Sequence, residues 1–308
     1  MPILHSNLET DLRLAVALDQ ALLTTLTDMA TVRNIPGLID FHGTVNGTGS
    51  DTGRLRYANL GGASHFAVTA AENTAVAETA ITDASVDIAV VRTALRRDVG
   101  DLAIATGFGD DVDPDRLAAD MIASYEGYFN VLYTTAGGTA ATDVGTTTVD
   151  MSVNDYFDAI FTLEIADAPG PYFCALAPRQ LADFQSSLRA EGSALMYHAA
   201  TPEMLAIKGQ GFAGEYLGVQ ILKLSDVITT GGDREGFMHG VNAFGYKVAI
   251  VDQRSMLGAG ASVAVRADEV LVEIVRNTTA ATVTVMGNAW VGLSLKEQAR
   301  VVGIVTDA

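Results

Sequence analysis

The sequence predicts an α+β fold, and two patterns lead to it. Amphipathic helices and short apolar strands are mixed along the chain without the regular strand and helix alternation of a doubly wound sheet. Residues 43–62 are rich in glycine, threonine and serine, and alternating apolar stretches follow them, which is typical of a long β-excursion. A third observation concerns function: no set of residues shows a recognisable catalytic or metal-binding pattern. Together these observations favour an interaction protein.

The composition indicates a chain with much surface to bury. Hydrophobic residues make up 49% of the 308 residues and charged residues only 18%, which excludes a wholly disordered chain. The buried surface lies either inside one well-packed protein, such as an enzyme, or between copies of an oligomer. Composition alone supports both interpretations.

The formal net charge of −18 argues against specific binding to duplex DNA, which requires lysine and arginine to replace condensed counterions. An acidic wall around packaged DNA is compatible with this charge, because repulsion keeps the polymer mobile. Acidity that serves only solubility is the alternative. The single cysteine, Cys174, excludes an intramolecular disulfide and lies in an apolar run that indicates a buried side chain. We expect no membrane span and no secretion signal.

The N-terminal part predicts a helix and then the β-excursion. Apolar residues recur at near-helical spacing over residues 7–30, and Pro36-Gly37 ends the pattern. Such a helix packs either on its own domain or on a neighbouring chain. The excursion is not a phosphate-binding loop, because the Walker pattern of a lysine after the last glycine is missing.

The clearest helix is predicted over residues 113–135. Asp113 suits the N-cap, Pro114 suits the first helical position, and apolar residues follow three or four positions apart. Further helices are expected at residues 99–106, at 153–164, capped by Ser152 or Asn154, and at 179–190. The expected strands are 172–177, between two prolines, and 219–224, 244–251, 271–277, 282–286 and 301–305.

Reactive groups do not converge in the sequence. The five histidines are scattered without a zinc-binding pattern, and no nucleophile elbow occurs. The acidic run Asp110-Asp111-Val112-Asp113 lacks the glycine and the distal glutamate of a calcium loop. We therefore expect no catalytic residues, no cofactor and no metal site.

The order of these features resembles that of the major capsid proteins of tailed bacteriophages, whose Hong Kong 97-type fold is shared with encapsulin shells. The resemblance covers about residues 31–308 and rests on order and pattern, because this family has no sharp motif. Residues 173–179 are similar to the family's strand and turn before a helix, with Ala177 in place of a polar residue. Residues 215–221 resemble its Gly-x-Pro-Val strand without the proline.

The resemblance implies a division of the chain into four parts. They are an N-terminal arm (1–42), an extended β-hairpin loop (43–85), a peripheral domain (86–145 and 266–308) with a spine helix at 113–135, and an axial domain (146–265). Some members crosslink a loop lysine to a neighbouring subunit. Residues 43–85 contain no lysine, so this loop cannot form that crosslink.

The implied function is that of a major capsid protein, which assembles into hexamers and pentamers of an icosahedral shell around double-stranded DNA. Its expected partners are other copies of the chain, scaffolding, portal and decoration proteins, and DNA contacted non-specifically, without a membrane. The expected location is the virion capsid, after assembly in the host cytoplasm. An encapsulin-type compartment is the nearest alternative, and a soluble hydrolase of unrecognised family is the alternative from another class.

The arm and the loop are expected to contact neighbouring subunits. The expected contact residues are Leu8, Leu12, Arg54, Arg56, Tyr57, His65 and Phe66. The two arginines either pair with acidic residues of the neighbour or remain solvated on a glycine-rich loop.

Overall fold

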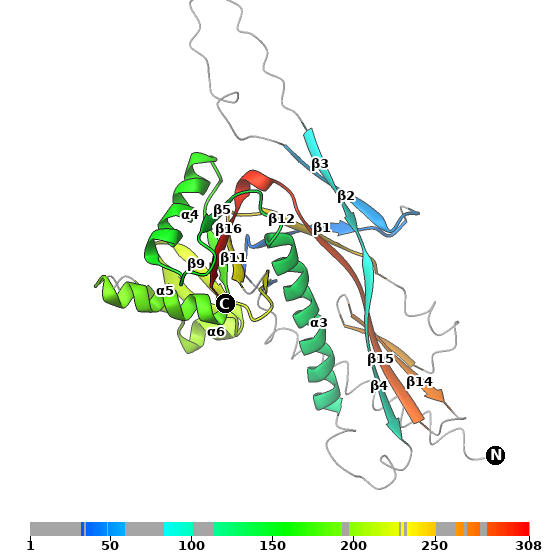
Figure 1. Ribbon diagram of the computed structural model, residues 1–308. Coiled ribbons are helices and arrows are strands. Elements are labelled where there is room, and N and C mark those ends of the chain that lie inside the picture. Colours follow the sequence, from blue (N-terminus) through cyan, green and yellow to red (C-terminus); the bar gives the residue numbers. More distant parts are fainter. Residues whose placement is uncertain are drawn as a thin grey trace, which may run out of the picture.

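Two β-sheets and one long helix organise the molecule, which is described here from a computed structural model (Figure 1). The structure describes residues 32–33, 35–47, 49–58, 83–100, 114–192, 197–227, 229–230, 233–250, 263–267, 270–277 and 282–307. Figure 1 shows a lobe of helices and strands on one side, and long strands with helix α3 (Pro114–Gly137) on the other. A two-stranded hairpin projects from the body.

The first sheet has six strands. Its order is β1 (Ile39–Thr44), β12 (Phe244–Val248), β15 (Thr282–Leu295), β14 (Val270–Asn277) and β13 (Val263–Ala267), with β4 (Val91–Gly100) also paired to β15. Strand β4 runs antiparallel to β15 over its whole length, from Val91 opposite Val291 to Gly100 opposite Thr282. These long strands form the elongated part of the molecule.

The second sheet has eight strands and forms the centre of the lobe. Its order is β5 (Asp143–Gly145), β16 (Val301–Asp307), β11 (Asp233–His239), β6 (Phe173–Leu176), β9 (Val219–Lys223), β8 (Phe212–Tyr216) and β7 (Tyr197–Ala199), with β10 (Thr229–Thr230) paired to β11. Helices α4 (Val153–Ile165), α5 (Pro178–Ala190) and α6 (Pro202–Lys208) belong to the same lobe (Figure 1). A short 3-10 helix, η4 (Gln298–Arg300), precedes β16.

Helix α4 begins where the sequence encodes a capping box. The Ser152 hydroxyl accepts a hydrogen bond from the Asp155 N–H at 3.3 Å, and the Ser152 N–H donates to Asp155 Oδ2 at 2.8 Å. The two residues thereby satisfy donors that a helix leaves free at its N-terminus. Tyr156, Ala159 and Leu163 then lie on the buried face at spacings of three and four residues.

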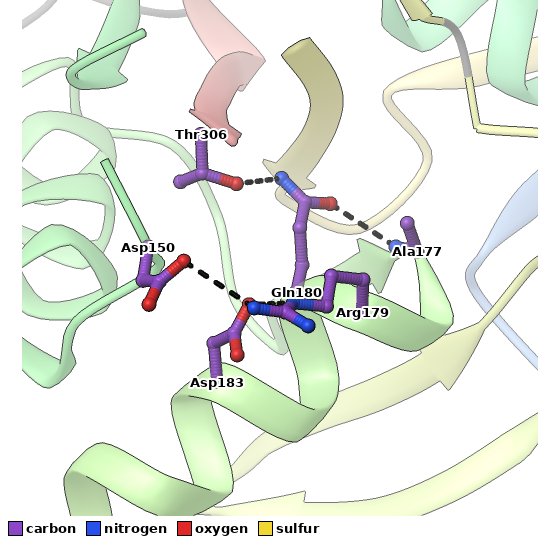
Figure 2. A network of polar contacts seen from close by, with 6 residues as sticks. All are labelled: Asp150, Ala177, Arg179, Gln180, Asp183 and Thr306. Carbon is purple, nitrogen blue, oxygen red and sulfur yellow. Dashed lines mark hydrogen bonds and ion pairs between the residues drawn. The ribbon is translucent and has the colours of Figure 1, made fainter. Parts of the chain in front are cut away.

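Helix α5 is fixed by a buried glutamine (Figure 2). Gln180 Oε1 accepts from the Ala177 N–H at 3.1 Å, while Nε2 lies 3.1 Å from Ile304 O and 2.8 Å from Thr306 Oγ1. Nε2 also lies 3.2 Å from Arg234 O. The side chain is fully buried, so these bonds replace the water that its amide would otherwise require. One residue thus links α5 to β16 and β11.

Helix α3 meets the lobe through an aromatic cluster. Tyr133 contacts Phe237 and Phe244 at centroid distances of 5.0 and 5.1 Å, and its hydroxyl lies 2.6 Å from His239 Nε2. His239 Nδ1 lies 2.8 Å from the Gly240 carbonyl, which can only accept, so Nδ1 carries the proton and Nε2 accepts from Tyr133. Burial lowers the pKa of His239 to about 4. The imidazole is therefore a neutral part of the core.

Three predicted helices and most predicted strands agree with the structure, whereas α6 was not predicted and the helix expected from residue 99 is wrong at its start, because residues 99–100 belong to β4. The predicted helices at 113–135, 153–164 and 179–190 are confirmed as α3, α4 and α5, and Ser152 is the N-cap of α4. The predicted strand 282–286 is too short, because β15 continues to Leu295. The N-terminal helix expected over residues 7–30 lies outside the described residues.

The four-part division of the chain stays a prediction, and sheet membership crosses its boundaries. Residues 39–42, assigned to the arm, form most of β1 in the six-stranded sheet. β12, assigned to the axial domain, pairs with β1 and β15 in the same sheet. β16, assigned to the peripheral domain, pairs with β11 at the centre of the lobe. The chain therefore passes between the two sheets more often than a division by sequence ranges implies.

Candidate functional site

The hairpin formed by β2 (Thr52–Ala58) and β3 (Asp83–Ala89) is the first candidate interaction surface. The strands are antiparallel, with Gly53 opposite Ile88 and Leu55 opposite Val86. Because side chains alternate along a strand, these four residues share one face of the hairpin and their neighbours in sequence share the other. In Figure 1 the two strands lie at the upper end of the long strands of the six-stranded sheet.

The inner face anchors the base of the hairpin to the body. Leu55 is fully buried, and Ile88 is almost so. Close approach requires glycines in the six-stranded sheet: a Cβ at Gly245 would meet Leu55 Cδ1 at 2.8 Å, and a Cβ at Gly292 would meet the Ala89 carbonyl oxygen at 2.2 Å. The missing side chains at these two glycines allow β2 and β3 to pack against the sheet.

A charged cluster lies under this base. Lys296 Nζ donates to Asp40 Oδ2 at 2.7 Å, and His42 Nε2 lies 3.1 Å from the same carboxylate oxygen. The Lys296 side chain is only 8% exposed, whereas the Asp40 side chain is 41% exposed, so water reaches the pair from the carboxylate side. Partial burial, followed by the Lys296 charge, lowers the pKa of His42. The cluster links β1 to the end of β15 below the hairpin.

The outer face of the hairpin is polar and exposed. The Arg54 guanidinium donates to Asp87 Oδ1 at 3.0 Å directly across the two strands, and both side chains are more than half exposed. This hydrogen bond and the Asp87 charge raise the pKa of Arg54. Arg56 lies opposite Ser85, is exposed, and forms no ion pair with another described residue.

The predicted contact residues are only partly covered by the structure. It places Arg54 and Arg56 on the outer face, and it places Tyr57 in β2 opposite Ala84. Arg54 already has an acidic partner within its own hairpin. Leu8, Leu12, His65 and Phe66 lie outside the described residues. The contact role of all seven residues stays a prediction.

Exposed apolar residues lie at two places on the lobe, neither of which was predicted from the sequence. Phe157, Phe161 and Ile165 are 43%, 62% and 67% exposed on α4. Met204 and Ile207 are 41% and 71% exposed on α6. The signal for α4 was present in the sequence, because residues 153–165 carry a second apolar stripe at i, i+4 and i+8 beside the stripe that enters the core.

The described residues show no convergence of reactive groups. No cluster of three or more potential metal ligands occurs among them. Cys174 is fully buried, and burial raises the pKa of its thiol far above the ordinary value, which disfavours the reactive thiolate. Of the helices within the described ranges, none has the length and hydrophobicity needed to cross a lipid bilayer. The exposed surfaces are therefore the best candidates for a functional role.

Comparison with known proteins identifies the fold. The sequence matches no protein-family model and no curated protein sequence. Similar solved structures include the capsid of the Cyanophage P-SCSP1u, with a TM-score of 0.58 and 12% identity over 90% of this chain and 88% of that one. The capsid of an empty GTA particle gives a TM-score of 0.59 and 12% identity over 91% and 90%. An encapsulin complex from Synechococcus elongatus gives 0.55 and 10% over 88% and 85%.

These comparisons place the chain in a structural class of capsid and encapsulin folds. The particular fold is the Hong Kong 97 type, as the sequence resemblance implied. The α+β class is confirmed as well. The likeness extends over 88–90% of this chain at 10–12% sequence identity.

Proposed function

We propose that this chain is the major capsid protein of a tailed bacteriophage, which self-assembles into hexamers and pentamers of an icosahedral shell around double-stranded DNA. The observation that carries the proposal is a fold shared with capsid proteins over about nine tenths of both chains. The projecting β2–β3 hairpin supports it, because one face anchors the base and the other is exposed.

Shell formation follows from contacts between unlike surfaces. When one patch of a subunit binds a different patch of the next, the contacts repeat around a ring and close. Rings of five and six copies then combine into a closed shell. The hairpin outer face and the exposed apolar residues of α4 and α6 provide surfaces of this kind.

The expected contact residues belong to this proposal. Arg54 and Arg56 meet a neighbouring subunit through the hairpin outer face, and Tyr57 lies on the same strand. Leu8 and Leu12 of the arm, with His65 and Phe66 of the loop, extend the contact. Scaffolding, portal and decoration proteins are the further partners, and assembly takes place in the host cytoplasm.

An encapsulin-type compartment is the second candidate, because the encapsulin complex shares the fold at a TM-score of 0.55. The two candidates differ in cargo. A phage shell encloses DNA, whereas an encapsulin-type shell encloses protein. Nuclease treatment of particles isolated from the native source, followed by nucleic-acid and protein analysis of their contents, separates the candidates.

The proposal is tested by the size of the assemblies that the purified chain forms. Size-exclusion chromatography with light scattering, followed by negative-stain microscopy, should show closed particles or rings of five and six subunits. A chain that remains a monomer or small oligomer at high protein concentration, also with a co-expressed scaffolding protein, would contradict the proposal. Such a result would favour the soluble hydrolase.

A further inference from the structure

We propose that an apolar patch on α4 docks onto an apolar patch at α6 of a neighbouring copy within the shell. The α4 patch consists of Phe157, Phe161, Ile165 and Leu217. The α6 patch consists of Met204, Ile207, Lys208 and Lys223. This inference rests on the proposed function and names one of its contacts.

The α4 patch is a continuous stripe. Phe157, Phe161 and Ile165 are separated by four residues each, so they lie along one side of the helix. The opposite side of α4 already fills the core through residues such as Tyr156 and Leu163, which are fully buried. The helix therefore has a second apolar side that the body of the lobe does not bury.

Leu217 adds an unusual backbone conformation to the same patch. It has φ 51° and is followed by Gly218 with φ 80°, in the turn between β8 and β9. A leucine in the left-handed region is strained, and glycine or asparagine is the usual residue there. The side chain is 43% exposed, so burial within its own chain offsets little of this cost. Contact with a partner would offset it.

Leu217 lies beside the α4 stripe. The residue before it, Tyr216, accepts a hydrogen bond at its carbonyl from the Tyr156 hydroxyl at 3.0 Å. The Tyr216 ring also lies 6.5 Å from the Phe157 ring, measured between centroids. The turn and the first part of α4 thus form one surface.

The α6 patch differs from the α4 patch in charge. Met204 and Ile207 are exposed on a helix that has no buried residue of its own. Lys208 ends the helix, and the Lys223 N–H donates to the Gly211 carbonyl at 2.7 Å just beyond it. The Lys208 amine donates to Gln220 Oε1 at 2.9 Å, so its charge stays at this end of the helix, and Lys223 is exposed. Glu203 lies at the other end of the helix.

The two patches are separated on the lobe. Lys208 stacks over the Phe212 ring at the start of β8, and Tyr216 at the end of β8 lies beside Phe157. A strand of five residues spans about 15 Å, so one copy cannot join the patches to each other directly. In Figure 1, α4 lies at the top of the lobe and α6 at the bottom. This arrangement suits a ring in which each copy contributes both patches.

The charges around the α4 patch indicate which surface binds it. Helix α4 contains Asp158 and Glu164 beside the stripe and no lysine or arginine. Two α4 patches facing each other would bring like charges together, and nucleic acid or an anionic membrane would be repelled. The amines at Lys208 and Lys223 complement the two carboxylates. A neighbouring copy's α6 patch is therefore the occupant that fits in both hydrophobicity and charge.

Thiol crosslinking of assembled particles tests the contact. Particles are assembled from the double variant Phe161→Cys with Ile207→Cys and then treated with a bismaleimide. Its spacer is shorter than the length of β8, about 15 Å, so it cannot join the two patches of one copy. Docking between neighbouring copies predicts a ladder of dimers, trimers and larger chains on a denaturing gel. Wild type should give no product, because its single thiol, Cys174, is fully buried. Co-assembly of the two single variants should give dimers only.

Other outcomes would overturn the inference. Dimers from Phe161→Cys alone would indicate that two α4 patches meet. Absence of a ladder from particles that microscopy shows to be closed would reject the contact while the proposed function stands. A ladder of equal yield from Val131→Cys with Ile207→Cys, a matched pair using an exposed residue of α3, would reject specific docking. Absence of particles for wild type would instead reject the proposed function.

A second variant does not depend on crosslinking. Phe161→Asp should leave the thermal unfolding midpoint of the unassembled chain unchanged, because the side chain is 62% exposed. It should reduce the yield of closed particles at least tenfold. Particle formation at the wild-type level would contradict the docking of α4.

Discussion

The eight-stranded sheet and the β2–β3 hairpin show two different ways of stabilising strands. The eight-stranded sheet has helices packed on it and fully buried strands such as β6, and even the buried amide of Gln180 has all its partners within the chain. The hairpin buries only the inner face of its base, through Leu55 and Ile88, and exposes Arg54 and Asp87. The lobe therefore makes its stabilising contacts within the chain, whereas the hairpin leaves one polar face exposed.

The largest expected effect is on the lobe, from Gln180→Leu. The change leaves the Ala177 N–H without its acceptor and removes the amide that donates to Ile304 O and Thr306 Oγ1, and each buried group left unsatisfied costs about 1–3 kcal/mol. The free energy of unfolding should fall by roughly 3–5 kcal/mol in urea titration. Gln185→Leu is the matched control, because Gln185 is half-buried and makes one bond of 3.3 Å. Equal losses for both variants would contradict the role of the buried network.

Acid should destabilise the junction between α3 and the lobe through His239. Its folded pKa of about 4 lies below the ordinary value of 6.5, so the unfolded chain binds the proton more readily. Above about pH 6.5 the His239 imidazole is neutral in both states and does not change the free energy of unfolding. The free energy of unfolding decreases as the pH falls from there towards 4. The loss amounts to about 3 kcal/mol when complete. Unfolding measured at a series of pH values should show a shallower decline for His239→Gln; parallel curves would contradict the assignment.

Loosening the hairpin from the six-stranded sheet should lower the free energy of unfolding less than the two changes above, and it should leave the lobe unchanged. A Cβ at Gly292 meets a backbone oxygen of β3, which cannot rotate away, so Gly292→Ala should cost about 2 kcal/mol. Hydrogen exchange should rise at β2 and β3 and stay unchanged at β6. Gly100→Ala is the control, since a Cβ there meets nothing within 4 Å. If hydrogen exchange at β2 and β3 is unchanged in Gly292→Ala, the hairpin is not anchored through this contact, and the contrast with the lobe is wrong.

The smallest effect on folding is expected from Arg54→Ala. The guanidinium and its Asp87 partner are mostly exposed, and water and salt screen such pairs. The thermal midpoint should not change measurably. The yield of particles should fall, because the outer face is proposed to meet a neighbour. A lower thermal midpoint with an unchanged yield of particles would mean that Arg54 stabilises the fold and does not contact a neighbour.

Local sequence signals predicted the helices because the signals act over a few residues. Ser152 with Asp155 encodes the start of α4, and Pro114 encodes the start of α3. Helix α6 carried the same kind of signal, with Thr201 as N-cap before Pro202, and was missed because it has only seven residues. Capping chemistry is readable without knowledge of the rest of the fold.

Long-range contacts explain what the sequence did not predict. The predicted strand 282–286 ends before Gly287, whereas β15 continues to Leu295 through Gly292, where the missing side chain lets β3 approach. Strand β11 begins just after Gly231-Gly232 in the sequence, and its pairing with β16 and β6 joins residues far apart in sequence. The exposed apolar stripe on α4 was likewise hidden, because the sequence alone does not show which of two apolar faces enters the core.

A cryo-EM reconstruction of particles formed by the purified chain is the most direct test of the account. We expect a closed icosahedral shell in which the hairpin side bearing Arg54 and Arg56 is covered by an adjoining subunit. A shell with that side facing solvent throughout, or a purified chain that yields only small compact oligomers, would contradict it.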